Sequence, residues 1–245
     1  MVDVPIRHKA PPSPRNALIA QWKRPPVLIV GGILLLLVLG VVFGAGLRFY
    51  SAYMTQTGLV SDDRPVEIAV AAETLIVPAN MLRSGKLRRG GAAERADLAL
   101  HWPDLNGYTD ETADDFRDGS PKAPVIYATV AARDAPVDST GRLDSVYARF
   151  FTGKPFPGPA GLVGRRLSPE SGYAGEVVFF VPSEPRPFVA RCTEASSDEI
   201  PATCIRDINF GRSLSLFYRF DRDLLADWRA LDAGMRERAT GFLRN

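Results

Sequence analysis

The longest apolar run in the chain extends from Val27 to Leu47 and contains no charged residue. At about 1.5 Å per helical residue, a run of this length can cross a hydrocarbon core of about 30 Å. Lys23 and Arg24 precede the run, and aromatic residues lie near both of its ends, with Trp22 before it and Tyr50 after it. The pattern predicts a transmembrane helix over 27–47, with the N-terminus in the cytoplasm because basic residues are concentrated on that side.

The alternative for this run is a cleaved signal peptide, whose apolar region would span about 7–15 residues and end at a small-x-small site. Gly44-Ala45-Gly46 resembles such a site poorly, and both the apolar run and the segment before it are too long. We therefore favour an uncleaved membrane anchor.

Gly40 and Gly44 form a small-xxx-small pair within the same run. This spacing can bring two helices into backbone contact, which would form a homodimer through the transmembrane helix. The interpretation that we favour is that glycine is simply frequent in membrane helices.

Beyond residue 65, apolar positions recur at the spacings of strands and helices. Alternating runs bounded by turn residues predict strands at 66–78 (two strands joined by a turn), 97–102, 123–133, 162–167, 176–182, 187–193, 204–210 and 213–220. Helical spacing recurs at 109–118, 142–151 and 222–243, and 152–161 is rich in proline and glycine. The expected fold is α+β, with one N-terminal transmembrane helix and then a largely antiparallel sheet and a C-terminal amphipathic helix.

The chain therefore divides into four predicted segments. These are a disordered basic cytoplasmic tail (1–26), the transmembrane helix (27–47), a juxtamembrane linker (48–65) and an extracytoplasmic domain (66–245). The overall net charge of +2 is concentrated in the tail, where the basic residues outnumber a single acidic residue, Asp3. The remaining chain carries no basic excess, so we expect no nucleic-acid partner.

Cys192 and Cys204 are the two cysteines of the chain. One ends a predicted strand and the other begins the next, so they can face each other at the base of a hairpin. Closing a loop of this size stabilises a domain by roughly 3 kcal/mol. A redox-active pair is usually C-x-x-C, and two cysteines without nearby histidines do not make a zinc site. We predict a structural disulfide of the kind that persists in oxidising compartments.

Motifs of known chemistry are missing from the sequence. There is no G-x-S-x-G, no H-E-x-x-H and no glycine-rich phosphate loop. His101 is the one histidine of the predicted domain, and it lies late in a strand without a partner motif around it. We therefore predict no catalytic residue, no metal and no cofactor.

A basic loop over 83–95 is the strongest candidate for binding. Arg83, Lys86, Arg88 and Arg89 lie in it among glycines, and such a loop could contact lipid head groups, an anionic envelope polymer or an acidic protein. The alternative is an ordinary solvated surface.

Three stretches suggest relatives: VPANMLR (77–83), DLALHWPDLNGYT (97–109) and FYRFDRDLLADWRALD (217–232). Together with the basic tail and the apolar run, they resemble uncharacterised single-pass membrane-anchored proteins of Gram-negative bacteria. The resemblance implies a bacterial inner-membrane setting, with the bilayer as a partner, and no particular activity.

The leading functional hypothesis is a membrane-anchored periplasmic domain that binds an envelope protein or polymer without catalysis. Two alternatives stay open at this point. One is an envelope hydrolase that uses acidic residues from separate strands, and the other is a membrane sensor or assembly factor.

Overall fold

A computed structural model describes residues 26–120, 122–194 and 201–244. The chain forms two compact units, Met1–Met54 and Thr55–Asn245. Except for Pro26, the basic tail predicted over 1–26 lies outside the described residues.

The first unit is represented by α2, a helix of 32 residues over Pro26–Thr57 that continues briefly into the second unit. Its side chains are described for residues 31–46, and the large apolar ones from Ile33 to Phe43 are exposed. The linker predicted over 48–65 is helical as far as Thr57, because α2 continues past the end of the apolar run.

Within the described residues, no helix is both long and apolar enough to cross a membrane. This finding contradicts the transmembrane helix predicted over 27–47 and makes that part of the fold-class prediction wrong. It also contradicts what depended on the helix, namely the single-pass anchor and an inner-membrane location with a cytoplasmic N-terminus and a periplasmic domain.

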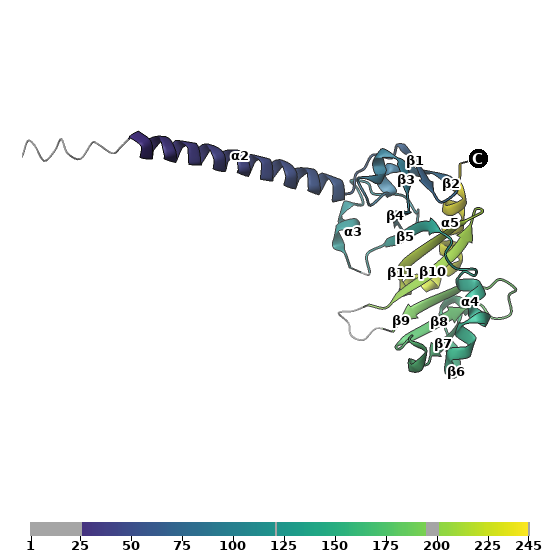
Figure 1. Ribbon diagram of the computed structural model, residues 1–245. Coiled ribbons are helices and arrows are strands. Elements are labelled where there is room, and N and C mark those ends of the chain that lie inside the picture. The colour runs from purple at the N-terminus through teal and green to yellow at the C-terminus, as the bar shows by residue number, and fades with distance from the viewer. Residues whose placement is uncertain (1–25, 121, 195–200, 245) are drawn as a thin grey trace, which may run out of the picture. The chain divides into compact units, whose positions relative to one another are not determined.

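The second unit is built on an eight-stranded sheet in the order β4-β5-β11-β10-β9-β8-β7-β6 (Figure 1). All neighbouring strands in it are antiparallel. The strands are β4 (Arg95–His101), β5 (Val125–Ala132), β6 (Phe151–Pro157), β7 (Val163–Leu167), β8 (Glu176–Phe180), β9 (Val189–Thr193), β10 (Thr203–Phe210) and β11 (Leu214–Asp221).

A three-stranded sheet in the order β2-β1-β3 lies in the same unit. Its strands are β1 (Pro65–Val70), β2 (Glu73–Pro78) and β3 (Gly91–Ala93), and β3 is parallel to β1. Every second residue of β1 is buried, which is the alternation expected of a sheet with one face on a core.

The second unit also contains α-helices and short 3₁₀ turns. The α-helices are α3 (Ala113–Asp118), α4 (Ser139–Ser145) and α5 (Trp228–Gly241). The 3₁₀ turns are η2 (Ala79–Met81), η3 (Leu87–Arg89), η4 (Tyr147–Phe150), η5 (Pro159–Gly161), η6 (Pro169–Ser171) and η7 (Arg222–Asp227). The Asp221 carboxylate accepts from the backbone N–H of Asp223, so this residue caps η7, which leads into α5.

The two faces of the large sheet are covered differently. One face packs its apolar residues, such as Leu216, in a core with Leu231 and Met235 of α5. On the other face, Leu143 of α4 packs with Val178 of β8. On this second face α4 contacts β9 and β10, whereas Phe116 of α3 packs with Ala99 of β4 and Val125 of β5. The candidate site lies between these two helices, where Phe217 and Arg219 of β11 are exposed.

Several predicted elements differ in detail from the structure. The helix predicted over 142–151 is interrupted at Val146, which separates α4 from η4. The proline–glycine segment 152–161 contains β6, an edge strand, where prolines are tolerated because one side needs no hydrogen-bond donors. The antiparallel sheet and the C-terminal helix of the fold-class prediction are present, in contrast to its transmembrane helix.

The predicted disulfide between Cys192 and Cys204 is present. The two residues face each other directly in the β9–β10 ladder, and both are buried on the side of the sheet that carries the core.

Candidate functional site

The part of the large sheet beside α3 carries a cluster of cations and aromatic rings. We call this cluster the basic–aromatic face, and it consists of Arg83, Lys86, Arg95, Tyr127, Phe217 and Arg219. Side chains alternate between the two faces of a strand, so Phe217 and Arg219 of β11 point to the same side. Register then places Arg219 opposite Tyr127 of β5, and Phe217 opposite Thr129.

Tyr127 is flanked by two guanidinium groups. The Cζ of Arg219 lies 5.5 Å from the centre of the ring, and the Cζ of Arg83 lies 4.9 Å from it. Arg219 reaches the ring from β11, whereas Arg83 reaches it from beyond β4, where its backbone N–H donates to the carbonyl of Asp97. Each such cation–π contact contributes about 0.5–1 kcal/mol at an exposed site and holds the guanidinium in place.

The face carries an excess of positive charge. The neighbouring carboxylates on the same side of the sheet are already engaged. Asp97 pairs with Arg95 at 3.1 Å and accepts the hydroxyl of Thr129 at 2.7 Å. Asp207, opposite Phe217, pairs with Arg142, and Asp221 accepts the backbone N–H of Asp223. Among the described residues, no carboxylate forms an ion pair with Arg83, Lys86 or Arg219. These three cations are therefore available to an anion from outside.

A hollow of about 640 Å³ opens on this face, lined by Leu59, Arg83, Lys86, Asp97, Phe116 and Tyr127. Beside it, Phe217 exposes 44% of its surface, and large apolar side chains are seldom so exposed in the described part of the second unit. The site thus combines an apolar surface with cations that have no carboxylate partner in the described part of the chain, beside strands whose other side is buried in the core.

The four basic residues singled out in the sequence separate in space. Arg83 and Lys86 line the hollow. Arg88 is buried and donates to the carbonyls of Leu82 and Gly58, and burial lowers the pKa of its guanidinium. Arg89 lines a different hollow. Arg88 therefore holds the loop to the domain, and the four residues do not form one surface.

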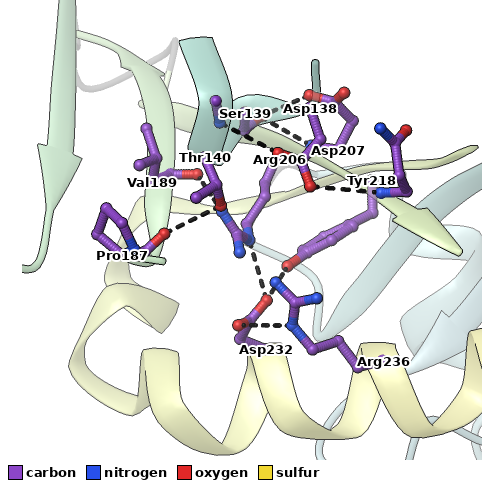
Figure 2. Close-up of polar contacts among 12 residues, drawn as sticks. Asp138, Ser139, Thr140, Pro187, Val189, Arg206, Asp207, Tyr218, Asp232 and Arg236 are labelled. Atoms are coloured by element: carbon purple, nitrogen blue, oxygen red, sulfur yellow. Dashed lines mark hydrogen bonds and ion pairs between the residues drawn. The ribbon is translucent and has the colours of Figure 1, made fainter. Parts of the chain in front are cut away.

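A buried polar network lies elsewhere in the unit (Figure 2). Arg206 of β10 is fully buried and donates to Asp232 of α5 at 2.9 Å and to the carbonyl of Val189 at 2.7 Å. The hydroxyl of Tyr218 donates to the same Asp232 oxygen at 3.3 Å. Burial raises the pKa of Tyr218, so its phenol stays a neutral donor. These bonds fasten α5 to the sheet.

A second part of this network fastens α4. Ser139 donates its hydroxyl to Asp207 at 2.5 Å and accepts the backbone N–H of Asp207 at 3.0 Å. Arg142 forms an ion pair with the same carboxylate. Because the carboxylates are already matched by cations and donors, we interpret the whole network as structural.

His101 forms a pair with a carboxylate that the sequence did not indicate. Its Nε2 lies 2.8 Å from Asp115 of α3, and the ring lies near Phe116. Among the described residues, no group of three or more His, Cys, Asp or Glu side chains could hold a metal ion.

Gly40 and Gly44 lie on α2, and an added Cβ at either would meet no atom within 4 Å. The contact predicted between two such helices stays a prediction.

Two residues of the face, Phe217 and Arg219, carried a signal that sequence reasoning missed. In SLSLFYRF (213–220), the apolar residues that alternate toward the core are Leu214, Leu216, Tyr218 and Phe220. Phe217 is an aromatic residue in the opposite phase, followed two positions later by Arg219. An aromatic residue and an arginine on the outer side of one strand could have indicated the face. Tyr127 lies on another strand, and its place beside these two residues could not be predicted without the strand order.

No protein-family model matches this chain, and no curated protein matches it significantly. Among solved structures, the chain is similar to Smlt3025, an immunity protein of the Stenotrophomonas maltophilia type IV secretion system, with 16% identity and a TM-score of 0.52. That match covers 75% of this chain and 94% of the other, and at this identity it shows a shared fold alone. The iron-regulated outer membrane lipoprotein FrpD of Neisseria meningitidis matches with 13% identity over 68% of this chain and 84% of that one, but its TM-score of 0.42 is too low to carry an argument.

Proposed function

We propose that this protein is a binding protein of the cell envelope, which engages a partner protein through the basic–aromatic face and works without catalysis. The observation that carries the proposal is the exposed Phe217 beside a tyrosine flanked by two arginines, neither of which forms an ion pair with a carboxylate of the described residues. Tyrosine and arginine are enriched at the energetic centres of protein interfaces, and aromatic residues in general are enriched across interfaces.

The framework of the face favours binding because it is ordered in advance. Tyr127 and Arg219 project from strands paired in register, and the opposite side of both strands is buried in the main core. A partner therefore gains contacts without first ordering a loop, which lowers the conformational cost of association.

Two observations support the envelope setting. The disulfide between Cys192 and Cys204 is of a kind that persists mainly in oxidising compartments. The shared fold with an immunity protein of a secretion system agrees with a recognition role, by analogy of fold alone.

The proposal is tested by photocrosslinking in cells of the native organism. The full chain carries p-benzoylphenylalanine at position 217, and a matched control carries it at Lys154, an exposed residue of β6 at the opposite edge of the sheet. We expect a discrete protein adduct from position 217 and none from position 154. Absence of a protein adduct from 217, with the chain folded and expressed, would overturn the proposal.

A further inference from the structure

We infer that the partner presents an acidic segment, with an aspartate or glutamate carboxylate that accepts hydrogen bonds from Arg83 and Arg219 beside Tyr127. The inference deepens the proposed function and rests on it, since it names the chemistry of the partner for the same face.

Charge complementarity is the first argument. The face has four basic side chains, and the carboxylates next to it on the same side of the sheet, Asp97, Asp207 and Asp221, are already engaged by Arg95 and Thr129, by Arg142, and by the backbone N–H of Asp223. A neutral or basic partner would bury Arg83 and Arg219 against nothing that compensates their charge, which is costly. An acidic partner removes that cost.

The position of the two guanidinium groups is the second argument. Their contacts with Tyr127 restrict the side-chain freedom of Arg83 and Arg219 before the partner arrives. Within the described residues neither guanidinium donates a hydrogen bond, so their N–H groups are available to a carboxylate. Planar guanidinium groups also match the two oxygens of a carboxylate, which favours a carboxylate over a single point anion.

The exposed phenylalanine is the argument for a protein rather than a lipid head group or an anionic polymer. Phe217 lies two residues before Arg219 on the same face of β11, so the two are separated by roughly 7 Å along the strand. A polar polyanion gains little from a ring that exposes 44% of its surface, whereas a polypeptide can cover it with an apolar side chain. An extended partner segment with an apolar and an acidic residue two positions apart matches this spacing.

The test uses the full chain with the photocrosslinking residue at position 217 and adds charge reversals. In Arg83→Glu and in Arg219→Glu, we expect the yield of the protein adduct to fall by about tenfold or more. Lys154→Glu reverses an equally exposed charge at the far edge of the sheet and should leave the yield unchanged. Mass spectrometry of the adduct should place the crosslinked partner residue within a few positions of an aspartate or glutamate.

The ionic strength and a compensating substitution in the partner provide two further tests. Raising the ionic strength from about 0.1 M to about 1 M shortens the electrostatic screening length from about 10 Å to about 3 Å. The yield of the protein adduct from the chain without charge reversals should then fall. Replacing the nearby partner acid with lysine should restore capture by Arg219→Glu.

The outcomes separate the inference from the proposed function. A protein adduct whose yield survives both charge reversals, or whose mapped site has no acidic residue nearby, overturns the inference and leaves the proposed function standing. An adduct with lipid or polysaccharide alone, or no adduct at all, overturns both.

Discussion

Ser213 donates two hydrogen bonds to Glu73, one from its backbone N–H at 2.8 Å and one from its hydroxyl at 3.0 Å, across 140 positions of sequence. The backbone N–H of Arg212 donates to the same carboxylate. Glu73 begins β2 of the small sheet and the donors lie in the β10–β11 turn, so one side chain connects the small sheet to the large one. Partial burial raises the pKa of Glu73, but the hydrogen bonds outweigh it and the pKa is lowered overall.

A carboxyl group whose pKa is lower in the folded state stabilises the fold above its unfolded pKa, and the contribution is lost as pH falls through the folded value. We therefore expect Glu73→Gln to reduce the free energy of unfolding by about 1 kcal/mol at neutral pH. The difference between variant and unaltered chain should shrink in acid. Urea denaturation at neutral pH and below pH 4 checks this, and a difference that grows on acidification would contradict it.

The ion pair between Arg206 and Asp232 predicts an asymmetric response to mutation. Asp232→Ala leaves the fully buried guanidinium of Arg206 uncompensated and should cost about 3–5 kcal/mol. The double variant Arg206→Met with Asp232→Leu removes both charges and should be less destabilised than Asp232→Ala alone. Arg236→Ala is the control, because this exposed residue pairs with the same carboxylate and should cost about 1 kcal/mol or less. Chemical denaturation measures all three, and a double variant as destabilised as Asp232→Ala or more would contradict the coupling of the pair.

Loss of the disulfide should lower stability without abolishing binding. Replacing Cys192 and Cys204 together with alanine should cost about 2–4 kcal/mol, because the unfolded chain regains the freedom of the closed loop. A single replacement should be worse in an oxidising space, since the remaining thiol can form intermolecular dimers. Alkylation and mass spectrometry without reductant test the pairing directly, and two modifiable thiols would disprove it.

We expect His101 to contribute to the stability of the fold and to take no part in catalysis. Its pair with Asp115 joins β4 to α3, so His101→Gln should lower the melting temperature modestly while crosslinking from position 217 persists. Asp115→Asn is the matched variant and should behave alike. If both variants abolish function while the fold is unchanged, the hydrolase alternative regains support.

The local elements of this protein follow from its sequence. Apolar alternation in the stretches 66–78, 123–133 and 204–220 specifies strands because a residue period of two places one face on a core, and the structure has strands at all three. The position of two cysteines at facing strand ends was enough to predict their bond. The apolar run over 27–47 predicted a helix, which α2 is, but the inference from that helix to a membrane span is contradicted by the described residues.

The assembly of the site was decided by the tertiary structure. Tyr127 and Arg219 are neighbours because β5 pairs with β11, a choice between strands far apart in sequence that no local pattern specifies. Arg83 and Arg88 are both arginines of the same predicted basic loop. Arg83 is exposed beside Tyr127, whereas Arg88 is buried and donates to backbone carbonyls. Local periodicity reports which face of an element is apolar. Which elements share that face, and which cations are then left without a partner, depends on long-range packing.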